Sequence, residues 1–176
     1  MQITRQADYA IRAVRYLAKQ GTQENIAIRK AAKEQEAAER KAASKKNDPK
    51  SKKEKQVGSS PSEVETKINI PTYEVAQAMK IPPSFLAKII SQLVIAGIVE
   101  TSRGASGGVI LARSPKDISV LDVVEAIDGH ILLNECVGSK KPCAFEDDCL
   151  VHPIWLEVQE SLVKRLRETR FDVLYN

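Results

Sequence analysis

The stretch "IPPSFLAKIISQLVIAGIVETSRGASGG", residues 81–108, decides the fold. Its two consecutive prolines cannot continue a preceding helix, so the stretch opens on a turn. A helix is then expected from Ser84, which caps it, to Ala96, with Gly97 as the stop. Its apolar residues form one buried face: Phe85, Leu86, Ile89, Ile90, Leu93 and Val94. The other side carries small polar or cationic side chains, namely Ser84, Lys88, Ser91 and Gln92.

The flanking residues complete a recognisable order of elements. A short strand is expected over Ile68–Ile70, and a short helix, capped by Thr72, over Thr72–Lys80. After the second helix, the β-prone runs Ile98–Ser102 and Val109–Ala112 flank the turn "RGASGG" and predict a hairpin. Helix, turn, helix and hairpin in this order predict a winged helix-turn-helix.

This arrangement suits DNA. The second helix is short enough for a major groove and exposes Ser84 and Lys88 near its start. The hairpin presents Arg103 beside Gly104, so guanidinium and backbone can closely approach a phosphate or a narrow minor groove. Helix-turn-helix units also serve as protein-interaction modules, and that reading is the alternative at this point.

The first part of the chain divides into a helix and an insertion. Residues 3–20 carry Ala10, Ala13, Val14 and Leu17 at helical spacing, and Gly21 ends the run. Residues 22–67 hold 10 Lys and 2 Arg against 7 Glu and 1 Asp, so this segment carries the whole net charge of +4. Its composition predicts a solvated helix followed by a disordered linker.

The C-terminal part predicts two more helices. Ser119 is expected to cap "VLDVVEAIDGH", and the last helix runs from Pro153 to about Arg170. Its apolar side chains form a wide stripe: Ile154, Trp155, Leu156, Val158, Leu162, Val163 and Leu166. Such a face favours packing against a partner helix and therefore a homodimer, with packing inside one subunit as the alternative.

Composition excludes several classes of protein. The 176 residues are 43 % apolar, enough for a globular core, and contain no apolar run of membrane-spanning length. The charged N-terminal sequence lacks the apolar block of a signal peptide, so we expect a cytoplasmic protein. No Ser/His/Asp set, paired-carboxylate site or C-x-x-C motif stands out, so we expect no enzyme.

The segment "CVGSKKPCAFEDDCLVH", residues 136–152, holds all three cysteines and one of the two histidines. Soft thiolates select zinc, copper(I) or iron–sulfur clusters. The spacing of Cys136, Cys143 and Cys149 does not match the paired knuckles of structural zinc sites and suits a larger inorganic core. His152 precedes Pro153, at the point where the loop meets the last helix. Zinc, a thiol switch and inert cysteines remain the alternatives.

These motifs together resemble the Rrf-two family of bacterial winged-helix regulators, which includes IscR-like and NsrR-like iron–sulfur sensors. The resemblance rests on "ITRQADYAIRAVRYLA", "IPPSFLAKIISQLVIAGIVETSRGASGG" and the cysteine loop. It implies a homodimer crossed by the last helix, an operator read by the helix starting at Ser84 and Phe85, and Arg103 in the minor groove. Ala87 stands where the family often has an acidic residue, and residues 22–67 have no counterpart.

The resemblance also implies an iron–sulfur cluster held by Cys136, Cys143 and Cys149, with two options for the fourth ligand. "CLVH" matches the IscR-like arrangement, in which His152 binds a 2Fe–2S cluster, and we favour it. Asp8 matches the NsrR-like position, in which the partner's Asp8 binds a 4Fe–4S cluster.

The overall expectation is a mainly α protein with a small β-hairpin wing, formed by a winged helix-turn-helix DNA-binding domain and a long C-terminal dimerisation helix. Its parts are residues 1–21 (first helix of the winged-helix domain), 22–67 (insertion), 68–114 (helix-turn-helix and wing), 115–135 (helix leading to the sensor loop), 136–152 (cluster-binding loop) and 153–176 (dimerisation helix and tail). The expected function is a transcriptional regulator whose operator binding responds to iron–sulfur status, redox state or nitric oxide.

Overall fold

The computed structural model describes residues 3–22, 27–28, 31, 34–35, 69–104, 107–138, 143 and 148–174. The chain divides into two compact units, Met1–Lys19 with Asn69–Asn176, and Gln20–Ile68. In the second unit the described positions 27–28, 31 and 34–35 are helical and exposed. Nearly all of the expected insertion, including its linker, lies outside the described residues.

Helix α1, Arg5–Gln20, begins the first unit, and its buried side matches the expected apolar spacing. Its buried residues are Ala7, Ala10, Ala13, Val14, Leu17 and Ala18. The helix begins after Thr4, whose Oγ1 accepts a hydrogen bond from the Ala7 amide at 3.2 Å. This bond satisfies one of the amides that the first turn leaves without a helical partner.

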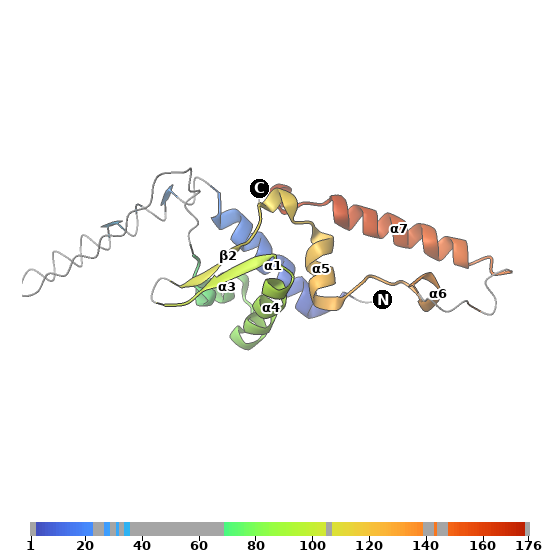
Figure 1. The fold of residues 1–176 in the computed structure, drawn as a ribbon, viewed down its shortest axis with the longest axis horizontal. Helices are drawn as coiled ribbons and strands as arrows, with labels where there is room; N and C mark the ends of the chain where they lie inside the picture. The colour runs from blue at the N-terminus through green and yellow to red at the C-terminus, as the bar shows by residue number, and fades with distance from the viewer. Residues whose placement is uncertain are drawn as a thin grey trace, which may run out of the picture. The chain divides into compact units, whose positions relative to one another are not determined.

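The helix-turn-helix consists of α3, Thr72–Met79, and α4, Pro83–Ile95, whose axes differ by 116° (Figure 1). The turn is made possible by Lys80 at φ 53°, and the Ile81 amide bonds back to the Ala76 carbonyl at 2.9 Å. None of the described helices is by itself long and apolar enough to cross a membrane, and only the bent pair α3 and α4 passes that test jointly.

Two expectations for these helices are wrong. Neither Thr72 nor Ser84 caps its helix, because Pro71 and Pro82 occupy the N-cap positions and no cap hydrogen bond from a described side chain is made there. Proline suits the start of a helix because its fixed φ is already helical and it has no amide to satisfy. Each hydroxyl therefore lies inside the first turn.

The buried face of α4 is narrower than expected. Leu86, Ile89, Ile90 and Leu93 are buried, but Phe85 is 50 % exposed and Val94 is 39 % exposed. The sequence prediction placed Phe85 and Val94 in the core only because both side chains are apolar. Phe85 and Val94 instead lie on the flanks of α4, where the neighbouring elements cover only part of each side chain.

The wing is an antiparallel hairpin of β1, Val99–Ser102, and β2, Gly108–Leu111. The expected strand before α3 is reduced, within the described residues, to a bridge between Ile70 and Val109. A Cβ at Gly108 would lie 2.4 Å from the Ile70 carbonyl oxygen, so this close approach requires glycine.

Helix α5, Val120–Asp128, begins where the sequence predicts. The Ser119 hydroxyl accepts from the Asp122 amide at 3.1 Å, and the Asp122 carboxylate accepts from the Ser119 amide at 2.8 Å. This reciprocal pair is a capping box. Phe171, fully buried, bonds through its amide to the Ile118 carbonyl, so the end of the chain returns to the winged-helix core.

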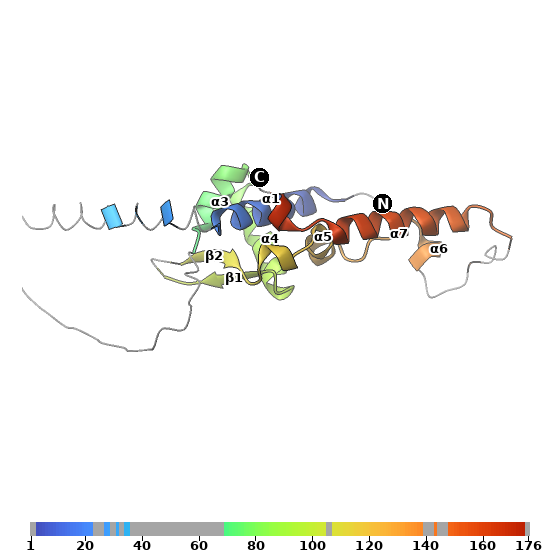
Figure 2. The same cartoon turned by 90° about the horizontal axis from the view of Figure 1, so that it is seen from above.

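The last elements are the single turn α6, Glu135–Gly138, and the helix α7, His152–Glu168. Helix α6 places Cys136 in a helical turn, which the loop expectation did not include. Figures 1 and 2 both show α6 beside α7, and the amide of Leu133 donates to the Gln159 side chain at 3.0 Å. The residues between α5 and α6 are thus anchored on α7.

Candidate DNA-binding surface and cysteine segment

Helix α4 presents one continuous exposed face opposite its buried one. The face consists of Ser84, Ala87, Lys88 and Ser91, which follow helical spacing and are all exposed. The Ser91 hydroxyl donates to the Ala87 carbonyl at 3.0 Å and is therefore already engaged. Lys88 supplies the cation at the centre of this face, and Ser84 a hydroxyl at its start. A face of this kind suits the edges and phosphates of a DNA groove.

Phe85 lies beside this face and is held by α1. Its ring meets the Tyr9 ring edge-on, with centroids 6.3 Å apart and planes at 80°. The Arg12 guanidinium carbon lies 5.7 Å from the centroid of Tyr9. Sequence reasoning missed Tyr9, because nothing in a local pattern pairs two aromatic residues 76 positions apart.

A second contact joins α1 to α4. The Gln6 amide nitrogen donates to the Gln92 side-chain oxygen at 2.5 Å. A third contact joins α1 to α5, where the amide and hydroxyl of Thr4 donate to the two carboxylate oxygens of Asp128 at 2.9 and 2.6 Å. The start of α1 is therefore fixed to both the candidate reading helix and the end of α5.

The wing presents Arg103 as expected. Arg103 is exposed at the tip end of β1, and Gly104 follows at φ 105°, a backbone conformation that favours glycine. At the base of the wing, the Arg113 Nε donates to the Gly97 carbonyl at 3.2 Å. This bond ties the residues just after β2 to the turn that follows α4, so the base of the wing is positioned relative to α4.

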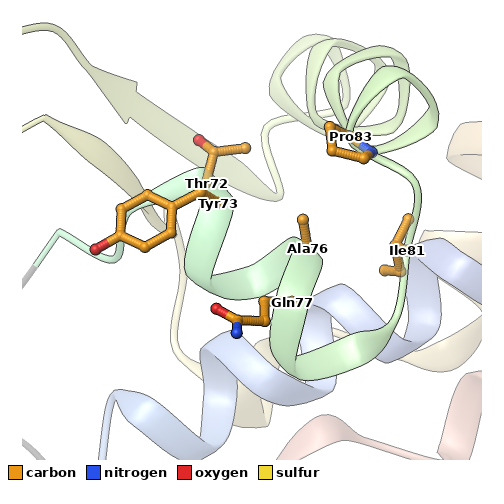
Figure 3. A pocket seen from close by; sticks show the side chains of 6 residues that line it. All are labelled: Thr72, Tyr73, Ala76, Gln77, Ile81 and Pro83. Carbon is orange, nitrogen blue, oxygen red and sulfur yellow. The ribbon is translucent and has the colours of Figure 1, made fainter.

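A mostly apolar hollow of about 420 Å³ lies between α3 and the start of α4 (Figure 3). It is lined by Thr72, Tyr73, Ala76, Gln77, Ile81 and Pro83. Pro83 directly precedes Ser84, so the hollow borders the exposed face of α4. Sequence periodicity gave no sign of it, because it arises from the angle between two helices.

The cysteine segment follows α5. Cys136 lies in α6, while Cys143 and Cys149 lie outside helices, and all three thiols are free and half-buried. His152 is the first residue of α7, and its Nδ1 is buried without a hydrogen-bond partner among the residues that the structure describes. Among the residues that the structure describes, no three His, Cys, Asp or Glu side chains form a group that could hold a metal ion.

The donor chemistry nevertheless fits an iron–sulfur cluster. Three free thiols within one short segment are soft ligands, and the unpartnered imidazole nitrogen of His152 is a further donor. Because the four side chains are not gathered, binding would require the segment to close around the cluster. Asp8, the alternative ligand, forms an ion pair with Arg12 at 2.6 Å and is half-exposed.

The apolar stripe of α7 is partly buried in its second half and exposed in its first half. Its later residues Leu162, Val163 and Leu166 pack against the core. Its first half leaves four large apolar side chains exposed, from 36 to 55 %: Ile154, Trp155, Leu156 and Val158. Leu150 and Val151, just before the helix, are also exposed. Large apolar faces of this kind mark interaction surfaces.

Comparison with known proteins agrees with this arrangement. Residues 63–176 match the model of the Rrf2 (Rrf-two) family, described as an iron-dependent transcriptional regulator. The chain belongs to the Rrf2 family. The curated relatives of this Rrf2 protein are named HTH-type transcriptional regulators, in agreement with the description of the family.

Among curated proteins, the HTH-type transcriptional regulator IscR of Klebsiella pneumoniae is 30 % identical over 106 residues. The IscR of Pectobacterium carotovorum is 29 % identical over the same length. Each match covers 60 % of this Rrf2 chain and 64 % of the relative. The chain therefore spans less than two thirds of the length of these two relatives.

Solved structures confirm the fold. CymR, titled the global cysteine regulator of B. subtilis, superposes with a TM-score of 0.61 at 18 % identity, covering 99 % of this chain and 96 % of CymR. T. potens IscR superposes with a TM-score of 0.58 at 19 % identity, covering 99 % of this chain and 86 % of that one. At this identity they establish the winged-helix fold of an Rrf2 regulator and no more.

Proposed function

We propose that this Rrf2 regulator is a cytoplasmic homodimer that binds an operator in double-stranded DNA and whose operator affinity is set by an iron–sulfur cluster. The observation that carries the proposal is the segment 136–152, in which three free thiols lie between α5 and α7 and the imidazole of His152, with a nitrogen that has no partner among the described residues, begins α7. The names of the relatives, IscR, and the family description, iron-dependent, support the same conclusion.

For DNA, we propose that α4 enters the major groove with Ser84, Phe85 and Lys88 near the bases. In helix-turn-helix proteins the second helix reads base edges through its N-terminal residues. Arg103 and Gly104 of the wing would contact the adjacent backbone or minor groove, where a guanidinium favours the negative potential. The exposure of all five residues supports this assignment.

For the dimer, we propose that residues 153–176 carry the interface through the exposed half of α7. Ile154, Trp155 and Val158 would be covered by the same residues of the partner in an isologous contact. Two reading helices related by twofold symmetry would then contact half-sites about one DNA turn, roughly 34 Å, apart.

For the cluster, Cys136, Cys143 and Cys149 would supply three thiolates and His152 the fourth donor, which favours a 2Fe–2S cluster. In the alternative, a 4Fe–4S cluster with the partner's Asp8, a carboxylate that is already paired with Arg12 through Oδ2 would become the fourth ligand. When bound, such a cluster supplies a group that is lost or altered by oxidation or nitric oxide. Without the cluster, Cys136, Cys143 and Cys149 would no longer share a ligand that ties them to one another.

The cluster-bound and cluster-free forms of the dimer would then fit the operator differently, and this difference changes operator affinity. With the thiolates tied, the ends of α5 and α7 are held at one spacing, and the two copies of α4 keep one separation. With the thiolates free, that constraint is lost. The expected coupling is about 5- to 150-fold in operator affinity.

A second candidate is a thiol switch without a cluster. The ungathered cysteines and the likeness to CymR, one of whose S. aureus structures is titled an oxidized form, favour it. Anaerobic native mass spectrometry separates the two, since it reports subunit number, iron and sulfide together. A dimer carrying iron and sulfide supports the cluster, while a metal-free dimer whose operator affinity still changes with thiol oxidation supports the switch.

The fourth ligand is tested by matched variants of the anaerobic protein. His152→Ala is expected to lose the visible absorption of the cluster, whereas Asp8→Asn is expected to keep it. The opposite pattern would assign the 4Fe–4S arrangement. Cys143→Ala serves as the positive control, because loss of any thiolate should prevent loading.

A further inference from the structure

We propose that Thr4, Gln6 and Tyr9, here called the α1 brace, are positioning residues that couple the cysteine segment to the reading helix α4. This inference rests on the proposed regulation of operator binding. It adds a route within one subunit that neither the cluster ligands nor the DNA-contacting residues include. In Figures 1 and 2, α1 lies beside both α4 and α5.

The brace holds α4 at two points. Tyr9 meets Phe85, and Gln6 meets Gln92. Phe85 and Gln92 are seven residues apart, so they lie on the same side of the helix, two turns or about 10 Å apart. Two contacts at this separation restrain the translation of α4 along α1 and its swing about either contact. One contact would leave that swing free.

The restrained side adjoins the exposed face. Phe85 and Gln92 lie about 90° around the helix from Ser84, between the exposed face and the buried one. A small rotation of α4 permitted by loss of these contacts would therefore move Ser84 and Lys88 sideways relative to a DNA groove. Base contacts tolerate little displacement, because hydrogen bonds weaken steeply with distance and angle.

The other end of the brace reaches the root of the cysteine segment. Both donors of Thr4 bind the two oxygens of Asp128, the last residue of α5. Cys136 follows eight residues later. Between them Ile131 is buried in the core and Leu133 is bonded to Gln159 of α7, so this connection is held at two intermediate points and is not slack. A shift of the segment therefore pulls on Asp128 and, through Thr4, on α1.

Coupling is reciprocal, which gives a test that needs no cluster. If the state of the cysteine segment alters DNA binding, bound DNA must alter the segment. The probe is the duplex that the protein itself selects from a randomised library. The readout is the rate at which the thiols of cluster-free protein react with an aromatic disulfide reagent, with and without this duplex at saturation.

In the unaltered protein we expect the duplex to change the thiol reaction rate at least about 5-fold, the lower end of typical coupling. Gln6→Ala and Tyr9→Ala are each expected to reduce this effect to less than about 2-fold at saturating duplex, because one point of restraint is lost. Tyr9→Phe keeps the ring and should preserve the effect. Thr4→Val should abolish the effect and Thr4→Ser restore it.

An effect on folding is separated from an effect on coupling by comparing a variant that also weakens the start of α1 with one that does not. Thr4→Val also removes the cap of α1, whereas Gln6→Ala leaves that cap intact. Both are checked by circular dichroism. The inference is overturned if folded Gln6→Ala and Tyr9→Ala proteins retain the full effect of DNA on the thiols, or if saturating DNA does not change the rate in the unaltered protein.

The same experiment distinguishes this inference from the proposed function. If the protein binds no iron and yet the DNA effect depends on the brace, the cluster proposal fails and the brace stands. If iron loads and tunes operator affinity but the brace variants keep that tuning, the brace fails and the cluster proposal stands.

Discussion

Alanine substitutions at two neighbouring residues of α4 are expected to have different effects, one on operator binding and the other on stability. Lys88 is exposed on the candidate reading face, and Ile89 is fully buried beneath it. Lys88→Ala should leave the fold intact and weaken operator binding. Ile89→Ala should destabilise the winged helix itself. The pair therefore tests whether α4 is oriented as the structure has it.

The magnitudes follow from burial. Removing the Ile89 side chain beyond Cβ leaves a cavity in a close-packed core and costs about 2–5 kcal/mol of the free energy of unfolding. A surface change such as Lys88→Ala alters stability by about 0.5 kcal/mol or less. At the DNA, loss of one cationic contact costs about 1–3 kcal/mol, or roughly 5- to 150-fold in Kd.

Thermal unfolding by circular dichroism and operator titration by fluorescence anisotropy, at one fixed salt concentration, measure the two effects. Lys88→Arg, which keeps the positive charge, is the matched control for the DNA effect. A Lys88→Ala protein with the original Kd would refute the assignment of this face to DNA. An Ile89→Ala protein with an unchanged melting temperature would refute the packing of α4.

Three further outcomes are expected. Arg103→Ala should weaken operator binding by about 1–3 kcal/mol and lower the slope of log Kd against log salt by about 1 for each subunit; an unchanged slope would place the wing away from the phosphates. Ser119→Ala should cost about 1–2 kcal/mol of stability through loss of the capping box with Asp122, with Ser119→Thr as the control in thermal melts; an equal melting temperature would contradict it. Val158→Asp should convert the proposed dimer to monomer in light scattering while Glu157→Gln should not, and a Val158→Asp dimer would move the interface elsewhere.

Much of the fold could be predicted because its signals are local. The capping box at Ser119, the buried stripe of α1 and the hairpin around the glycine-rich turn depend on residues a few positions apart. Their spacing fixes which side of an element is apolar and where the element ends. The family could be predicted for the same reason, since its motifs are short and contiguous.

The starts of α3 and α4 show where a local signal misleads. Thr72 and Ser84 are good capping residues, but the prolines before them already provide the entry geometry. The preference of Thr and Ser for the N-cap position competed with the fixed φ of proline, and the proline determined how each helix begins. The exposed side chain of Phe85 is a different case, because its surroundings depend on Tyr9 from another helix.

The sequence by itself determined most of the helices, the hairpin, the winged-helix class and the residue types available for DNA and for a cluster, because these follow from spacing and chemistry along the chain. Only the tertiary structure decided that Tyr9 supports Phe85, that Gln6 meets Gln92 and that Thr4 holds Asp128. Such contacts join residues 76 to 124 positions apart. They depend on the angles at which helices pack, and no periodicity within a single helix encodes those angles.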